Sequence, residues 1–324
     1  MTVIVTGAAG FIGFHVAQAL QARGERVVGI DNLNDYYEVS LKEARLAVLR
    51  KSATFSFVKA DISDRDAIFA IIDANSDTSG IVHLAAQAGV RYSRENPYVY
   101  IQANVMGQVV MLEAARRLKG LQHFVYASSS SVYGANTEMP FAVGQRVEQP
   151  ISLYAATKRA DELISYTYSH LYSIPQTGLR FFTVYGPWGR PDMALFRFTD
   201  AILSGRPIEV YGEGKMERDF TYVSDLIEAI MRLMPLPPAG APVPFRIVNI
   251  GGGQPIGLMT FIETLERALG KPAIRNMLPM QQGDVPRTYA SPELLKQLTG
   301  FYPQMGLAQG IGAFVNWYRD YYRK

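Results

Sequence analysis

A tyrosine and a lysine four positions apart, Tyr154 and Lys158, are the first residues whose types and spacing could do chemistry. This spacing places two side chains on one face of a helix. A phenol is a poor base at its free pKa of about 10, but a neighbouring ammonium would favour the phenolate, which could then deprotonate an alcohol. A hydroxyl from the serine run 128–131 could hold that alcohol. Because a chain with 19 tyrosines contains such spacings by chance, the assignment depends on the elements around the pair.

Three glycines, Gly7, Gly10 and Gly13, stand between a β-branched run at residues 2–6 and a helical pattern. Strand, tight turn and helix in this order suit a pyrophosphate, since N–H groups at a helix N-terminus bind anions and side chains there would block approach. The second strand ends at Asp31, whose carboxylate can accept both ribose hydroxyls and repels a 2′-phosphate. The sequence therefore predicts NAD as hydride acceptor. The alternative is a plain glycine turn, with Asp31 as a helix cap.

Further candidates lie at the ends of the next two strands. Asp61 follows the third strand, where it could meet the adenine amino group or cap the next helix. Small residues at 85–89 follow the fourth strand and would let a cofactor pass over the sheet edge. His83 lies inside that apolar strand, and we interpret it as a packed core histidine rather than a ligand.

Strands and helical patterns alternate through the first 183 residues. The expected strands are residues 2–6, 26–31, 55–59, 80–84, 123–127 and 179–183, and the expected long helices are 97–118 and 154–172. This alternation predicts an α/β fold with a doubly wound parallel sheet of the Rossmann type. The regularity breaks afterwards, so we predict an NAD-binding domain over 1–183 and a smaller α/β substrate domain over 184–324. A strand at 245–250 is expected to return to the first sheet, and the pocket should lie between the two parts.

Composition excludes several classes of protein. Of the 324 residues, 48% are hydrophobic and 19% charged, which is typical of a globular enzyme. The net charge of +3 is too small to indicate nucleic acid or a membrane surface as partner. The absence of cysteine excludes thiol nucleophiles and cysteine-held metals, and no metal site is predicted. We find no apolar run of about 18 residues and no room for a signal peptide before the first strand, so we expect a cytoplasmic protein.

Six motifs occur in a fixed order: Thr6–Gly13, Leu84–Ala86, Ser128–Gly134, Tyr154–Lys158, Leu179–Pro187 and Arg218–Val223. Over essentially the whole chain they resemble the extended short-chain dehydrogenases/reductases of the nucleotide-sugar epimerase type. Three longer segments are most similar to the UDP-glucuronate 4-epimerases within that family: Asp31–Tyr37, Ala85–Ser93 and Tyr185–Ala194.

The resemblance implies a set of cofactor and catalytic residues. The implied NAD contacts are Gly7, Gly10, Phe11, Ile12, Gly13, Asp31, Asn32, Asp61, Ile62, Leu84, Ala85, Ala86, Asn104, Ala127, Tyr154, Lys158 and Phe181. The implied catalytic residues are Tyr154, Lys158 and Ser129, with Ser131 left open as the alternative hydroxyl. A homodimer through a bundle of the two long helices is also implied.

The serine run narrows the reaction. Related dehydratases carry an Asp-Glu pair just before the Val-Tyr-Gly, and related decarboxylases carry a Glu two positions before that tyrosine. This chain has Ser130 and Ser131 there, so no acid is available to deprotonate C5 or assist elimination. The resemblance therefore implies interconversion of UDP-glucuronate and UDP-galacturonate through a 4-keto intermediate, with no net redox change.

The expected substrate contacts come mostly from the second part of the chain. Arginine forks at Arg218 and Arg287 could hold the diphosphate, and Tyr211 could stack the uracil. Donors to the uronate carboxylate are expected on the loop after the sixth strand. The full set is Ser130, Ser131, Arg91, Thr183, Arg190, Arg197, Tyr211, Arg218 and Arg287.

Three other functions stay open at this point. One is 4-epimerisation of a neutral UDP-sugar of the UDP-glucose/UDP-galactose type, and another is decarboxylation of UDP-glucuronate. The third is an NAD-sensing scaffold without activity, against which the intact Tyr154 and Lys158 pair argues.

Overall fold

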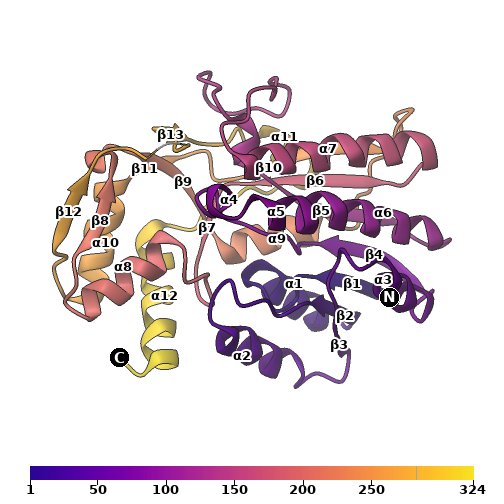
Figure 1. Cartoon of the computed structure of the whole chain (residues 1–324), viewed down its shortest axis with the longest axis horizontal. Helices are drawn as coiled ribbons and strands as arrows, with labels where there is room; N and C mark the ends of the chain where they lie inside the picture. Colours follow the sequence, from indigo (N-terminus) through magenta and orange to yellow (C-terminus); the bar gives the residue numbers. More distant parts are fainter. Residues whose placement is uncertain (282) are drawn as a thin grey trace.

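One seven-stranded sheet organises the computed structural model, which describes residues 1–281 and 283–324 (Figure 1). The strands run in the order β10-β6-β5-β4-β1-β2-β3, and every pairing is parallel. Their bounds are β1 (Thr2–Thr6), β2 (Arg26–Asp31), β3 (Phe55–Lys59), β4 (Thr78–His83), β5 (His123–Ser129), β6 (Gln176–Phe181) and β10 (Phe245–Ile250). The central strands are apolar runs buried on both faces, as parallel sheets require. The predicted doubly wound fold is confirmed.

Helices cover both faces of this sheet (Figure 1). One face carries α1 (Phe11–Ala22), α2 (Val39–Leu49), α9 (Val223–Leu233) and α11 (Glu293–Thr299). The other carries α3 (Arg65–Asp73), α6 (Gly107–Arg117) and α7 (Leu153–Tyr172). The helices α9 and α11 belong to the later part of the chain but pack against α1 and β10, respectively. The domain boundary at residues 183/184 therefore stays a prediction. Helices from after this boundary form part of the layer that covers the first sheet.

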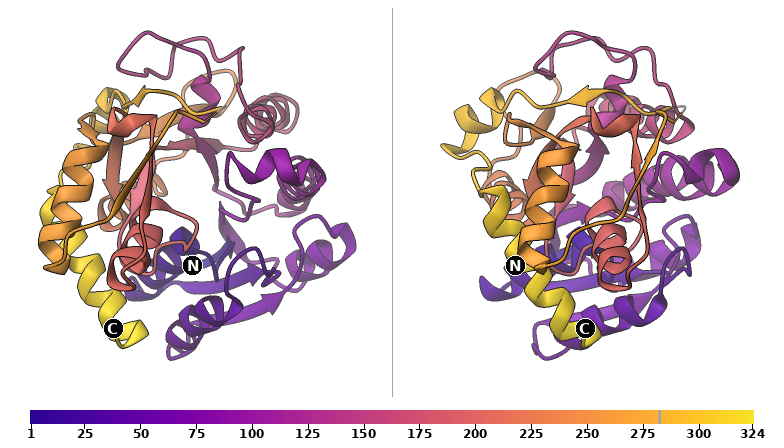
Figure 2. Two further views of the ribbon diagram at one scale, coloured as in Figure 1. Left: turned by 60° about the vertical axis from the view of Figure 1, so that its left-hand side comes forward. Right: turned by 90° about the vertical axis from the view of Figure 1, so that its left-hand side faces the viewer.

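A smaller part lies against the carboxyl ends of the sheet's strands. It contains β9 (Glu217–Tyr222) with β7 (Thr183–Tyr185), β11 (Pro255–Gly257) and β13 (Arg287–Thr288), and the pair β8 (Ile208–Tyr211) and β12 (Arg275–Leu278). Its helices are α8 (Ala194–Leu203), α10 (Leu258–Leu269) and α12 (Leu307–Tyr322). Figure 2 shows α10 and α12 side by side on its outer side. An aromatic core around Phe196, Phe261 and Phe314 holds these elements together.

The long helix expected at residues 97–118 is interrupted rather than uniform. A short α4 (Tyr92–Glu95) precedes it, and the helix then consists of α5 (Pro97–Tyr100), a π-helical segment η1 (Ile101–Met106) and α6. A π turn adds one residue per turn and so redirects the side chains within it, which makes such turns frequent at functional sites. Among the described residues, no helix is both long and apolar enough to cross a bilayer.

Candidate active site

A cavity of about 410 Å³ lies at the carboxyl ends of the parallel strands, where they face the smaller part. In open α/β sheets this edge is where ligands bind, because every strand delivers its C-terminal loop there. Most of the predicted cofactor and catalytic residues line it: Gly7, Gly10, Phe11, Ile12, Gly13, Asp31, Asn32, Asp61, Ile62, Leu84, Ala85, Ala86, Ala127, Ser129, Tyr154, Lys158 and Phe181.

The glycine turn between β1 and α1 leaves no room for side chains. Gly7 has φ +70°, and a Cβ there would lie 2.9 Å from the backbone nitrogen of Ala85. A Cβ on Gly13 would lie 2.0 Å from the carbonyl oxygen of Gly7. The turn therefore presents bare backbone at the N-terminus of α1, which is the cradle that a pyrophosphate needs.

Asp31 lies at the end of β2, beside this turn. Its carboxylate accepts hydrogen bonds from the backbone N–H groups of Ala9 (3.2 Å) and Leu33 (2.9 Å). Burial raises the pKa of Asp31, and the positive charge of Lys42 opposes that rise. Lys42 also lines the cavity and donates to the carbonyl of Asn34 (2.7 Å), a role that the sequence analysis missed. The placement of Asp31 fits a ribose acceptor, and it caps neither α1 nor α2.

Hydrogen-bond partners distinguish the alternative roles of Asp61 and of His83. Asp61 accepts from the backbone N–H of Ser63 (2.9 Å), while Asp64 is the N-cap of α3, so Asp61 stays at the cavity edge. The His83 ring lies 2.7 Å from the Thr6 hydroxyl, and burial lowers its pKa to about 3. The interpretation of His83 as a packed core residue is confirmed.

The helix α7 positions the tyrosine–lysine pair. The Ser152 hydroxyl accepts from the backbone N–H of Ala155 (3.1 Å), which starts the helix one residue before Tyr154. Both Tyr154 and Lys158 then line the cavity. The Lys158 ammonium donates to the carbonyl of Ala127 (3.1 Å) on β5, so it is held against the sheet.

A buried carboxylate accompanies that ammonium. The Lys158 Nζ also donates to Asp161 (3.1 Å), whose side chain is 1% exposed. Burial raises the pKa of Asp161 to about 6, although Lys158 acts in the opposite direction. The sequence analysis missed this partner, although its spacing of three residues on one helix was visible.

The four serines at residues 128–131, at the end of β5 and directly after it, have different partners. The Ser128 hydroxyl donates to Glu162 (2.7 Å) on α7, and Glu162 in turn pairs with Arg180. The Ser129 oxygen accepts from the backbone N–H of Ser131 (3.2 Å), which leaves its own proton for another acceptor. All four serines line the cavity. The choice between Ser129 and Ser131 as the key hydroxyl stays open.

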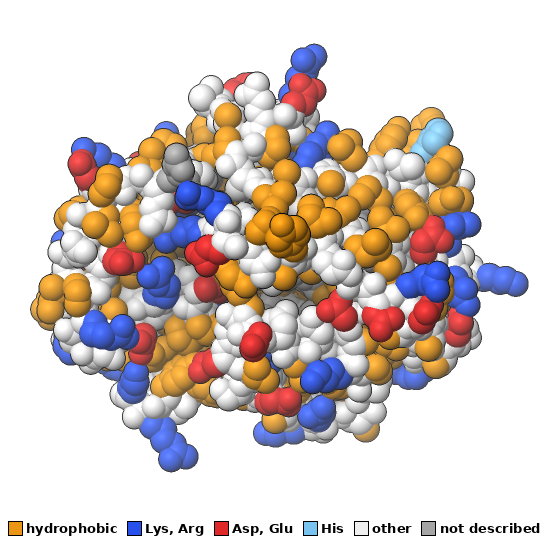
Figure 3. Space-filling view, viewed as in Figure 1, with side chains coloured by type: hydrophobic (Ala, Val, Ile, Leu, Met, Phe, Trp, Pro, Cys, Tyr) orange, Lys and Arg blue, Asp and Glu red, His pale blue; other side chains and the backbone are white. Residues whose placement is uncertain are grey.

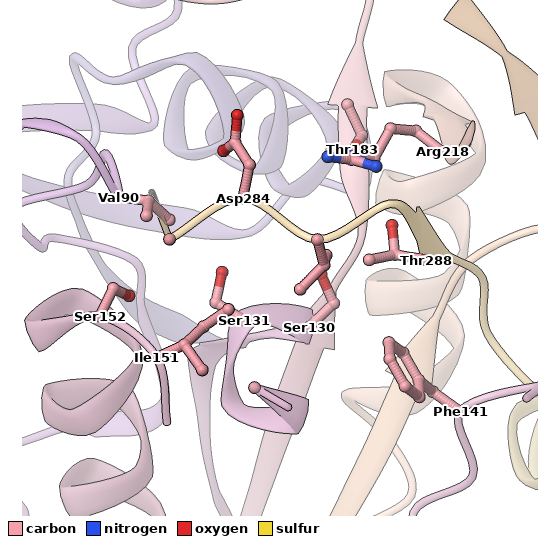
Figure 4. Close-up of a pocket in the computed structure, with 13 residues that line it drawn as sticks. Val90, Ser130, Ser131, Phe141, Ile151, Ser152, Thr183, Arg218, Asp284 and Thr288 are labelled. Atoms are coloured by element: carbon pink, nitrogen blue, oxygen red, sulfur yellow. The ribbon is translucent and has the colours of Figure 1, made fainter. Parts of the chain in front are cut away.

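A second pocket of about 150 Å³ continues the cavity toward β9 and β13 (Figure 4). It shares Ser130, Ser131 and Thr183 with the large cavity and adds Arg218. Figure 4 shows Thr183 and Arg218 next to each other on its wall. Hydroxyl groups beside a guanidinium suit sugar and phosphate oxygens.

Four expected substrate residues line neither pocket. Arg91, Arg197, Tyr211 and Arg287 lie on the smaller part or facing it, with the three arginines at least 43% exposed. Each arginine is paired with a carboxylate: Arg91–Asp284 (3.3 Å), Arg197–Glu209 (3.2 Å) and Arg287–Glu217 (2.6 Å). The Arg91 guanidinium also covers the Tyr211 ring at 4.6 Å, where a uracil was expected to stack. Their contact with substrate stays a prediction.

Asn104 lies behind the cavity wall. It is 2% exposed within η1 and does not line the cavity. Its amide accepts from the backbone N–H of Gln87 (2.8 Å) and donates to the Gln87 carbonyl and to the Thr157 hydroxyl (3.0 Å). Both ends of the amide have partners inside the protein, so Asn104 ties the loop after β4 to α7, and its contact with NAD stays a prediction.

The loop after β7 carries Arg190 into the cavity wall. Its guanidinium forms a bidentate pair with Asp192, through Nε (3.0 Å) and Nη2 (2.6 Å). The Tyr36 hydroxyl donates to the same carboxylate (3.3 Å) from the loop after β2. Two loops that are distant in sequence therefore meet at this ion pair.

A second arginine, Arg45 on α2, is fully buried behind the same loop. It donates to the carbonyl of Ala9 (2.8 Å) in the glycine turn and to the carbonyls of Trp188 (2.6 Å) and Gly189 (3.3 Å). Trp188 has φ +61°, a left-handed conformation that costs about 1 kcal/mol or more for such a residue. Arg45 holds this strained turn next to the cofactor cradle.

Fold and site together define a dinucleotide-binding α/β protein with a tyrosine–lysine pair. Among the described residues, no group of acidic and histidine side chains could hold a metal ion. The sequence profile of the NAD dependent epimerase/dehydratase family matches residues 3–251. The chain belongs to this family.

Individual relatives resemble the chain over its whole length. It is 54% identical to a probable UDP-glucuronate 4-epimerase of Rhizobium meliloti, covering 100% of this chain and 98% of the relative. It is 44% identical to UDP-glucuronate 4-epimerase 4 of Arabidopsis thaliana, over 99% and 76%. The crystal structure of UDP-glucuronic acid 4-epimerase from Bacillus cereus, in complex with UDP-glucuronic acid and NAD, superposes with a TM-score of 0.92 at 33% identity, covering 99% of this chain and 100% of that one.

Proposed function

We propose that the protein is an NAD-dependent 4-epimerase that interconverts UDP-glucuronate and UDP-galacturonate. The observation that carries the proposal is the cavity itself, which is lined by Tyr154, Lys158, the serine run 128–131 and the glycine cradle, and which adjoins the pocket that contains Arg218. Relatives and solved structures with this activity support the same reaction.

The cofactor would occupy the glycine cradle. The bare turn at Gly7 and Gly13 would hold its pyrophosphate, and Asp31 would accept the ribose hydroxyls. Bound there, NAD supplies a hydride acceptor that later returns the hydride. Lys158, held by Ala127, would bring its positive charge near the ribose and near Tyr154.

The chain's own side chains then move one proton. The Tyr154 phenolate removes the proton of the C4 hydroxyl, and Lys158 stabilises the phenolate. Ser129 holds the alcohol through a hydrogen bond. After the 4-keto sugar turns over about its diphosphate link, Tyr154 returns the proton and the opposite configuration results.

The sugar carboxylate requires donors that do not promote carbon dioxide loss, because the 4-keto intermediate is a β-keto acid. Thr183 lines both pockets and Arg190 lines the large cavity, and we assign the carboxylate to these two residues. Arg218 is the diphosphate candidate that lines a pocket.

Incubation of purified protein with a panel of UDP-sugars tests this proposal. We expect inversion at C4 of UDP-glucuronate, followed by NMR, without stoichiometric release of carbon dioxide. Inversion of UDP-glucose alone would establish the neutral-sugar alternative, and carbon dioxide release would establish the decarboxylase. If NAD binds but no sugar is converted, the alternative of an NAD-sensing scaffold without activity would be favoured.

We further infer a homodimer. Apolar side chains gather over α5, η1 and α7 on the face shown in Figure 3, including Tyr98 (82% exposed), Ile101 (49%), Leu163 (54%) and Tyr166 (49%). A patch of this kind on neighbouring helices is typical of a protein interface. A second copy, packing the same helices together, would cover it. The proposal also places the enzyme in the cytoplasm, which cell fractionation would test.

A further inference from the structure

The carboxylate of Asp192 lies outside the cavity and is bound to Arg190, the candidate cation for the sugar carboxylate. It engages two of the nitrogens of Arg190, Nε at 3.0 Å and Nη2 at 2.6 Å, and it accepts a third hydrogen bond from Tyr36. Arg190 and Tyr36 line the cavity, whereas Asp192 does not. Among the described residues, the Arg190 Nη1 has no hydrogen-bond partner. The guanidinium thus presents one free edge and one occupied edge.

The pair stays ionised at neutral pH. Burial would raise the pKa of Asp192, but the Arg190 charge outweighs it, so this pKa lies below its usual range. Asp192 in turn helps burial to raise the pKa of Tyr36 to about 12, so that hydroxyl keeps its proton. The other titratable groups that interact electrostatically with Arg190 are the tyrosines Tyr37, Tyr100 and Tyr154. The local charge next to the sugar is therefore close to zero rather than positive.

The near-neutral charge of the Arg190–Asp192 pair matters because the sugar must rotate within the site. Inversion at C4 presents opposite faces of the sugar in sequence, so the carboxylate on C5 cannot keep one contact throughout. A bidentate arginine–carboxylate pair is among the strong polar contacts in proteins. If Arg190 were free to form one with the substrate, it would favour a single orientation.

We infer that Asp192 is a positioning residue that holds Arg190 by its Nε edge and limits its attraction for the uronate carboxylate, so that the sugar can rotate. The inference rests on the proposed function. It concerns the balance between binding and turnover, in which Asp192 acts through Arg190 from outside the cavity.

The variant Asp192→Asn tests this role, because it removes the charge and keeps the size. We expect KM for UDP-glucuronate to fall by about threefold or more and kcat to fall by about tenfold or more, since tighter ground-state binding slows a step that must break it. The reduced nicotinamide should accumulate during steady-state turnover, which absorbance would show. The smaller neutral variant Asp192→Ser should change KM and kcat in the same directions and serves if the first does not fold.

Two comparisons make the result specific. Asp66→Asn removes an exposed carboxylate that pairs with Arg65 at 2.8 Å on α3, and it should change neither constant. A merely structural role of Asp192 would lower kcat/KM without lowering KM, and would affect UDP-glucose and UDP-glucuronate equally. That outcome would overturn the inference.

Binding measurements separate this inference from the proposed function. If the unmodified protein does not invert UDP-glucuronate, the proposed function fails. The ratio of Kd for UDP-glucuronate to Kd for UDP-glucose still reports on Asp192, and it should fall by about threefold or more in Asp192→Asn because carboxylate repulsion is removed. An unchanged ratio would contradict the role of its charge.

Discussion

In the proposed mechanism, Tyr154 contributes a proton acceptor and little binding energy for the substrate. We therefore expect Tyr154→Phe to reduce kcat by about a thousandfold or more while Kd for UDP-sugar changes by less than about threefold. Calorimetric titration and a C4-inversion assay would measure the two effects. A variant that keeps a tenth of the wild-type rate would contradict the assigned role.

The contribution of Asp161 to the stability of the folded protein depends on pH. Its pKa of about 6 lies above its ordinary value of 3.8, so the folded protein holds the proton more tightly than the unfolded chain. The contribution of this group to stability is therefore present at low pH and is lost as pH rises toward and through 6. Between pH 5 and pH 7.5 the loss amounts to about 1.4 kcal/mol.

Comparison of wild type with Asp161→Asn isolates that contribution, because all other titrations are shared. Urea denaturation would measure the free energy of unfolding of both proteins. Between pH 5 and pH 7.5 the wild type should lose about 1.4 kcal/mol relative to Asp161→Asn. A difference that does not change with pH would show that Asp161 is not protonated in the folded protein.

At the scale of elements, the approach of α1 to β1 depends on glycine. A methyl group on Gly13 would have to displace the Gly7 carbonyl, which lies 2.0 Å from the added atom. We expect Gly13→Ala to lose about nine-tenths or more of the NAD that copurifies, since the turn is also the cofactor cradle. Acid release and chromatography would quantify the bound cofactor.

The matched control is Gly312→Ala on α12, where the added methyl group meets no heavy atom within 4 Å. This variant should retain its NAD and gain about 0.5–1 kcal/mol from higher helix propensity. Equal cofactor content in both variants would contradict the close-approach argument.

The helices and strands were largely predictable from the sequence, whereas several side-chain contacts between them were not. The alternation of apolar runs with glycine turns and helical patterns predicted the sheet, its order of elements and the cavity at its carboxyl edge. The charges of Arg197 and Arg287 could not be judged, because their partners Glu209 and Glu217 adjoin them only after β8 and β13 are formed. Asn104 is a similar case: its amide is satisfied by groups that only folding brings near it.

At the scale of the whole molecule, the apolar patch over α5, η1 and α7 predicts the oligomeric state. We expect Leu163→Glu combined with Ile101→Glu to convert a dimer into a monomer, because two carboxylates would be buried without partners. Light scattering coupled to size exclusion would measure the mass. Met277→Glu, on the exposed strand β12, should remain dimeric, and a dimeric double variant would refute the interface.

The contacts of the buried Arg45 limit how the substrate-binding part could be exchanged between related proteins. Its guanidinium joins the carbonyl of Ala9 in the first turn of the chain to those of Trp188 and Gly189, more than 140 positions later. A chimera that exchanges the substrate-binding part at residue 184 would present this buried cation with carbonyls from a foreign loop. The transplantable unit is therefore discontinuous: the loop that contains Trp188 and Gly189 must travel with the helix that carries Arg45.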